Sequence, residues 1–208
     1  MSEFDELFDG SKLPYILSMA KTLSKEECKQ IYIYMEKHKP KKILEFGVQF
    51  GCSTAVFLQI SKWLGLNIEL HSWDIIDLVK SDCVSKKDFI FHKEDITGRE
   101  DQTIVKYNPD MVFLDAHPYY LTKGLMHSCL DRKIDFLCHD VGIQVFNRAK
   151  IRSNNFKDKS NSNMAEWELY LLGELIHESL IREDSFENND VKVVCYRDRF
   201  GLAIVENK

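Results

Sequence analysis

The fold is decided by the stretch KKILEFGVQFGCST, residues 41–54. A short apolar strand ends on a carboxylate, Glu45, and two glycines follow, Gly47 and Gly51, before the apolar helical run STAVFLQISKWL begins. Glycine lets the backbone turn sharply and lets a ligand approach without meeting a Cβ atom. A strand, a glycine turn and a helix start in this order predict a cradle for a nucleotide-sized ligand.

Short apolar strands alternate with helical segments through the rest of the chain, a pattern typical of a parallel sheet covered by helices on both faces. Strands are expected at residues 42–46, 69–73, 89–92, 111–114 and 136–139. Helices are expected at residues 54–64, 104–107, 120–129 and 164–180. Near the end, two β-rich runs flank Arg197-Asp198-Arg199 and predict a hairpin. The predicted fold class is α/β, with a Rossmann-like doubly wound and mainly parallel sheet.

One domain is expected overall, because 208 residues can bury a substantial core without a second one. Residues 1–40 are interpreted as a helical segment that packs on the core, and residues 41–208 as the main domain. Within the first segment, Ser24 and Glu27 form a capping-box pattern at a helix start. The polar stretch 151–163 predicts a surface loop, and loops of this length often cover functional sites.

Composition narrows the classes of partner and the compartment. The formal net charge is -5, which gives no support for a nucleic-acid partner. The acidic start MSEFDELFDG does not resemble a secretory signal, and no apolar run is long enough to cross a membrane. The six cysteines contain no CxxC pair, so reduced thiols in a cytoplasmic protein are expected.

The spacing of the glycines indicates the kind of ligand. The dinucleotide pattern GxGxxG is absent, and the Glu45 carboxylate would repel a pyrophosphate at close range. An amino-acid ammonium would suit that carboxylate instead. Asp74 follows the second expected strand, where it can accept hydrogen bonds from ribose hydroxyls, and Asp95 follows the third, within reach of an adenine amine. A single such aspartate is more often a turn residue, but three acids at three successive strand ends favour a binding site.

Five segments in order carry a family resemblance: EFGVQFGCST, HSWDIID, KEDITG, PDMVFLDAH and FLCHDVG. This ordered set resembles the class I S-adenosylmethionine-dependent methyltransferases. It is most similar to the small O-methyltransferase branch that includes catechol-type and macrolide-sugar enzymes and cephalosporin hydroxylase-like proteins. The resemblance covers residues 41–142 and the C-terminal hairpin, which would supply the antiparallel strand of the family's seven-stranded sheet.

The resemblance implies S-adenosylmethionine as the cofactor and assigns residues to each part of it. Glu45, Gly47 and Gly51 surround the methionine moiety, the hydroxyls of Ser53 and Thr54 hold its carboxylate, Asp74 binds the ribose and Asp95 lies near the adenine. Asp115, at the end of the fourth strand, is assigned to the cofactor edge as well.

The fourth and fifth expected strands end in LDAHPYY and CHDVG, so Asp115, His117, His139 and Asp140 should converge beyond the sheet. Methyl transfer requires an aligned nucleophile and removal of its proton, and a histidine suits the role of base. Either His117 or His139 is the candidate. Asp115 and Asp140 can instead hold Mg²⁺, as in the metal-dependent members of the family, but Val141 occupies the position where those enzymes carry a further ligand.

The predicted function is methylation of an oxygen of a small molecule or sugar, with His117, His139 and Asp140 as the catalytic residues. The acceptor would be selected by the shape of a loop at residues 143–162 and by the N-terminal segment. A homodimer is common in the resembled group. Two alternatives stay open. One is a hydroxylase-like enzyme on the same fold, and the other is a non-catalytic module that binds a nucleotide or a partner protein.

Overall fold

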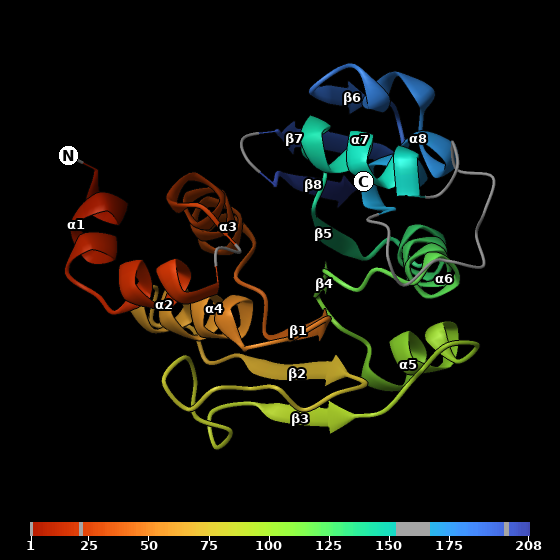
Figure 1. Cartoon of the computed structure of the whole chain (residues 1–208). Coiled ribbons are helices and arrows are strands. Elements are labelled where there is room, and N and C mark those ends of the chain that lie inside the picture. The colour runs from red at the N-terminus through yellow and green to blue at the C-terminus, as the bar shows by residue number, and fades with distance from the viewer. Residues whose placement is uncertain (1, 21–22, 153–166, 198–199) are drawn as a thin grey trace. The chain divides into compact units, whose positions relative to one another are not determined.

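The computed structural model describes residues 2–20, 23–152, 167–197 and 200–208 (Figure 1). The chain divides into two compact units, residues 1–95 and residues 96–208. The helices of residues 1–40 belong to the first unit together with the strands that follow them.

The first unit contains four helices and three parallel strands among its described residues. The helices are α1 (Glu3–Asp9), α2 (Leu13–Ala20), α3 (Lys25–His38) and α4 (Cys52–Trp63), and the strands are β1 (Lys42–Phe46), β2 (Glu69–Asp74) and β3 (Ile90–Lys93). β2 lies in the middle of the three, in the order β3-β2-β1. Glu45 on β1 pairs with Ser72 on β2, and Asp74 at the end of β2 pairs with Lys93. These strands lie within two residues of their predicted bounds.

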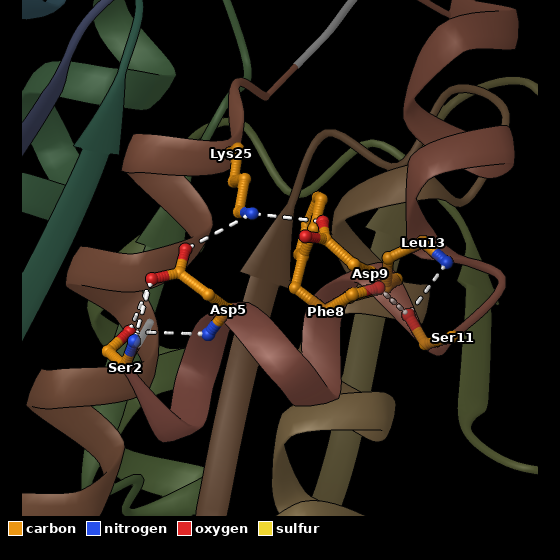
Figure 2. A network of polar contacts seen from close by, with 7 residues as sticks. All are labelled: Ser2, Asp5, Phe8, Asp9, Ser11, Leu13 and Lys25. Atoms are coloured by element: carbon orange, nitrogen blue, oxygen red, sulfur yellow. Dashed lines mark hydrogen bonds and ion pairs between the residues drawn. The ribbon is translucent and has the colours of Figure 1, made fainter.

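Polar caps and one lysine tie the N-terminal helices together. Ser2 and Asp5 form a capping box at α1, and Lys25 at the start of α3 contacts both Asp5 at 3.1 Å and Asp9 at 2.9 Å (Figure 2). The capping box predicted at α3 is present, because the Ser24 hydroxyl accepts from the N–H of Glu27. Both α2 and α3 pack against α4, so this segment covers the helix that follows the glycine turn.

Glycines bound α4 at both ends. Gly51 is the N-cap residue, with φ 84° and no side-chain cap. Gly65 follows the helix at φ 64°, and the N–H of Leu66 returns to the carbonyl of Ser61 at 2.8 Å. This reversal is a Schellman motif, which needs a left-handed residue after the helix. Gly65 therefore supplies the left-handed residue that ends α4.

The second unit contains helices around a mixed sheet. The helices are α5 (Glu100–Tyr107), α6 (Tyr119–Asp131), α7 (Ile143–Arg152), α8 (Glu168–Leu175) and the 3-10 helix η2 (Glu178–Ile181). The strands are β4 (Met111–Leu114), β5 (Asp135–His139), β6 (Ser185–Glu187), β7 (Val191–Tyr196) and β8 (Leu202–Asn207), in the order β4-β5-β8-β7-β6. β4 and β5 are parallel, whereas β8 runs antiparallel to β5 and pairs with β7.

The α/β fold class and the C-terminal hairpin are confirmed. The described residues contain eight strands, of which the short β6 is an addition to the seven expected. The helix expected at residues 164–180 is shorter: α8 ends at Leu175, and η2 follows it. Residues 143–152, expected as loop, form α7, while residues 153–163 of the expected loop lie outside the described residues. Within the described parts of the chain, none of the helices has the length and apolar character needed to cross a membrane.

Candidate functional site

The glycine turn lies in the first unit, between β1 and α4. Gly47, Gln49 and Gly51 all have positive φ, at 93°, 46° and 84°. A Cβ atom on Gly51 would lie 2.7 Å from Cγ1 of Val84, so a larger residue has neither the conformation nor the space. Gly51 has no side chain with which to cap the first N–H groups of α4, and N–H groups at a helix start suit a bound carboxylate. The turn therefore requires glycine at Gly51.

Glu45 is completely buried behind this turn, and its carboxylate joins three segments. Its Oε1 accepts from the hydroxyl of Ser53 at 2.5 Å, and its Oε2 accepts from the hydroxyls of Thr54 and Ser72, both at 2.6 Å. These hydrogen bonds satisfy a charge that would otherwise be costly to bury. The hydroxyls of Ser53 and Thr54, which were expected to hold a methionine carboxylate, thus donate to Glu45.

Asp74 holds the turn from the end of β2. Its Oδ2 accepts from the N–H groups of Val48 at 3.1 Å and Gln49 at 2.9 Å, and its Oδ1 accepts from Ile76 at 3.0 Å. A carboxylate has about four acceptor positions, so these bonds leave capacity for a ligand hydroxyl. Asp95 is exposed and is the last residue of the first unit.

The second unit brings Asp115, His117, His139 and Asp140 together at the ends of β4 and β5. Nδ1 of His139 lies 3.2 Å from Oδ1 of Asp115 and 3.5 Å from Oδ1 of Asp140. Nε2 of His117 lies 3.8 Å from Oδ2 of Asp140. The convergence expected for these four residues is present. Asp140 adopts a left-handed conformation, with φ 62°, and such strain in a non-glycine residue is typical of functional sites.

Glu168, a residue that the sequence analysis missed, completes this cluster. It is the first residue of α8, its side chain is 0% exposed, and its Oε1 lies 3.6 Å from Nδ1 of His117. Neither carboxylate oxygen has a hydrogen-bond partner within the described part of the chain. One signal was present in the sequence: Glu168 lies one helical turn before Leu171 and Leu172, on the apolar face of its helix.

Burial and mutual charge shift the pKa values of this cluster. Burial alone would lower the pKa of His117, but Glu168, Asp115 and Asp140 together raise it to about 10. Burial, together with the charges of Asp115 and Glu168, raises the pKa of Asp140 to about 7, although the two histidines oppose the shift. Burial also raises the pKa of Glu168. His117 therefore carries a proton at neutral pH in the absence of a cation.

The donor set fits a divalent cation. One ligand atom from each of Asp115, His117 and Asp140 can be chosen so that all lie within 4.8 Å of one another. Ligands on opposite sides of an ion bound at about 2.1 Å lie about 4 Å apart, so a small contraction would complete the site.

Val141, Trp167 and the remaining histidines have structural positions. Val141 is buried and apolar, so it supplies no ligand. Trp167 is fully buried and packs edge-on against Tyr119, which makes it a core residue. Among the remaining histidines, His71 contacts His92 and Glu69, His177 caps η2, and His127 is exposed on α6.

Solved structures share this fold over nearly the whole chain. An O-methyltransferase of Bacillus cereus in complex with S-adenosylhomocysteine is 14% identical, and the alignment covers 98% of this chain and 96% of that one at a TM-score of 0.62. The O-methyltransferase TomG of Streptomyces achromogenes, in complex with S-adenosylmethionine, gives 12% identity, 100% and 91% coverage and a TM-score of 0.59. A Podospora anserina methyltransferase with bound S-adenosylhomocysteine is 15% identical, and the alignment covers 100% of this chain and 89% of that one at a TM-score of 0.55.

Comparison with protein-family models finds no match, and comparison with curated proteins finds none either. The structural matches show that the fold is that of the class I S-adenosylmethionine-dependent O-methyltransferases, as the ordered sequence motifs predicted.

Proposed function

We propose that this chain is an S-adenosylmethionine-dependent methyltransferase that methylates an oxygen of a small molecule or sugar. The observation that carries the proposal is the glycine turn, which has left-handed glycines and an uncapped helix start on the fold of such enzymes. A cofactor without phosphate groups suits this turn, because the pyrophosphate of a dinucleotide would lie close to the buried negative charge of Glu45.

In the first unit, we assign the cofactor to the turn and the end of β2. The N–H groups at the start of α4 bind the methionine carboxylate, and Gly47 and Gly51 let the cofactor approach the backbone. Asp74 holds the turn and accepts from the ribose, and Asp95 lies near the adenine. Glu45, Ser53 and Thr54 act mainly through their shared hydrogen bonds, which fix the helix start relative to β1.

In the second unit, we assign the acceptor hydroxyl to the cluster of Asp115, His117 and Asp140. Methyl transfer is an in-line displacement, so these groups must orient the oxygen and help it lose its proton. A divalent cation bound there would lower the pKa of a coordinated hydroxyl. In the absence of a cation the pKa of Asp140 is about 7, so without an ion this carboxylate would itself accept the proton near neutral pH.

The histidines differ in the roles that we propose for them. His117 contacts Asp140 and Glu168 and holds a proton at neutral pH in the absence of a cation, so we do not place it as the base. We place it with the cation-binding residues, where its ring would give up that proton when an ion binds. His139 is almost completely buried and contacts Asp115, so we propose that it orients that carboxylate.

A non-catalytic module is less consistent with the second unit. Three carboxylates and two imidazoles at one sheet edge, with Glu168 fully buried, would weaken a purely structural core. Groups with strongly shifted pKa values cluster preferentially at functional sites. This argument supports an enzyme.

Release of S-adenosylhomocysteine tests the proposal. The purified chain is incubated with S-adenosylmethionine and a panel of phenols, catechols and sugars, with and without a chelator. We expect product with at least one hydroxylated acceptor, and about a 100-fold or greater loss in Asp140→Asn. Asp88→Asn, the same change at an exposed residue of the first unit, is the control. Acceptor turnover without S-adenosylhomocysteine would instead support a hydroxylase-like enzyme.

A further inference from the structure

His117 lies between two carboxylates, one toward each ring nitrogen. Nε2 lies 3.8 Å from Oδ2 of Asp140, and Nδ1 lies 3.6 Å from Oε1 of Glu168. Both distances exceed those of hydrogen bonds, so these contacts are ion pairs. The ring therefore presents Nε2 to the Asp115 and Asp140 cluster and Nδ1 to the protein interior.

Glu168 has no evident structural reason to be buried. Its side chain is 0% exposed, and neither oxygen has a hydrogen-bond partner among the described residues. An unpaired buried carboxylate costs several kcal/mol by general estimates. His117 is the basic group that contacts it, and Nδ1 of that ring also lacks a hydrogen bond in the described structure.

We propose that Glu168 is a positioning residue that orients His117 as a nitrogen ligand, so that the site selects a transition-metal ion such as Mn²⁺, Co²⁺ or Zn²⁺ over Mg²⁺. The inference deepens the proposed function. It rests on that function for the role of the ion, which is to lower the pKa of the acceptor hydroxyl. It assigns His117, together with Asp115 and Asp140, as the ligand set.

The arrangement has the form of a carboxylate–histidine–metal triad. In such triads a second carboxylate accepts the N–H of the ring nitrogen that does not bind the metal, which sets the tautomer and raises the basicity of the ligating nitrogen. Glu168 lies on the Nδ1 side of His117 and would accept the Nδ1–H once the two groups approach to hydrogen-bond distance, which leaves the Nε2 lone pair directed at the cluster. The charge of Glu168 then compensates the ion through the ring.

The nitrogen ligand determines the selectivity. Mg²⁺ prefers oxygen ligands and retains its waters, whereas imidazole suits the first-row transition metals. Val141 provides no oxygen beside Asp140, so the third protein ligand at this site is the imidazole of His117.

Metal affinity provides the first test. The full chain is stripped with a chelator, and its dissociation constants for Co²⁺ and Mg²⁺ are measured by competition with a chromophoric indicator. We expect Co²⁺ to bind more tightly, and His117→Asn to reduce the Co²⁺-to-Mg²⁺ affinity ratio about 10-fold or more, because an amide oxygen replaces the nitrogen. Glu168→Gln should weaken Co²⁺ binding by about 10- to 100-fold. His127→Asn, an exposed histidine on α6, is the matched control and should change neither affinity.

Spectroscopy provides a second readout that is independent of activity. Electron spin echo modulation of bound Mn²⁺ reports nitrogen directly coupled to the ion. We expect a ¹⁴N coupling in the wild type and in His127→Asn, and its loss in His117→Asn. If Glu168→Gln does not fold, as judged by circular dichroism, Glu168→Asp keeps the charge and should retain the coupling with weaker Co²⁺ binding.

An unchanged Co²⁺-to-Mg²⁺ ratio in His117→Asn, or a ¹⁴N coupling that survives that substitution, would overturn the inference. Undetectable binding of Co²⁺, Mg²⁺ and Mn²⁺ to the wild type would also overturn it. Each measurement is made without S-adenosylmethionine, and cofactor binding is measured separately. Failure of the metal tests in a chain that binds S-adenosylmethionine would therefore leave the proposed function intact.

Discussion

Oε1 of the fully buried Glu168 lies 3.6 Å from Nδ1 of His117, a residue that is 39% exposed at the side chain. The pair connects the N-terminal end of α8 to the loop after β4. A buried charge is tolerated in a fold when an opposite charge lies beside it, and removing one partner leaves the other uncompensated. The pair therefore makes the stability of the second unit depend on the charge of the cluster.

Replacing Glu168 should change the titration of His117. Glu168, Asp115 and Asp140 raise the pKa of His117 to about 10 against the effect of burial, and Glu168 is the main contributor among the three. In Glu168→Gln the pKa of His117 should fall toward its ordinary value or below. NMR titration of the ring in the metal-free protein measures this shift. A pKa that stays near 10 in the variant would show that Glu168 does not hold the proton on the ring.

The same pair predicts how stability depends on pH. The folded pKa of His117 lies above its unfolded value of about 6.5, so the stability it contributes is fully present below pH 6.5 and is lost as the pH rises toward 10. His117→Ala should remove this pH dependence from the metal-free chain. Urea unfolding at pH 6 and pH 9.5 measures it. The difference in stability between wild type and variant should be larger at pH 6, and an equal difference at both values would contradict the assignment.

Gly51→Ala should disrupt the cofactor turn. The added Cβ atom would lie 2.7 Å from Cγ1 of Val84, at a left-handed residue. We expect a loss of about 2 kcal/mol or more in stability and a loss of S-adenosylmethionine binding. Gly65→Ala is the matched control, because Gly65 is also left-handed but nothing lies within 4 Å of its added Cβ. That variant should lose only about 1 kcal/mol and should keep its binding. Equal effects in the two variants would argue against a special role for Gly51.

Glu45→Gln should destabilise the first unit. The substitution replaces one acceptor oxygen by an amide NH₂ group where Ser53, Thr54 and Ser72 all donate. We expect a loss of about 2–4 kcal/mol, since hydrogen bonds to buried charged groups are worth about 1.5–3 kcal/mol each. Chemical denaturation measures the change, with Glu36→Gln on the exposed face of α3 as the control. A loss below about 1 kcal/mol would show that the three hydroxyls do not depend on the charge.

Much of the fold could be predicted from local patterns. β1 and β4 have their predicted bounds because each is a short apolar run flanked by polar or glycine residues. The capping box at Ser24 and the left-handed Gly65 are determined by residues within one helical turn. The sequence also predicted the convergence of Asp115, His117, His139 and Asp140, since the ends of neighbouring parallel strands meet at one edge.

Features that depend on distant packing could not be predicted. The place of Glu168 on the apolar face of its helix indicates burial, but only the packing of α8 shows that it lies beside His117. The donation of Ser53 and Thr54 to Glu45 depends on the angle between β1 and α4, which no local pattern reports. Residues 143–152 were expected as part of a loop, yet they form α7.

Calorimetric titration with S-adenosylmethionine tests the central claim most directly. We predict saturable binding to the wild type with one site per chain, and binding weakened about 10-fold or more in Asp74→Asn, which loses an acceptor for the ribose and for the turn. Asp88→Asn should bind as the wild type does. No detectable heat with the folded wild type, or undiminished affinity in Asp74→Asn, would contradict the account.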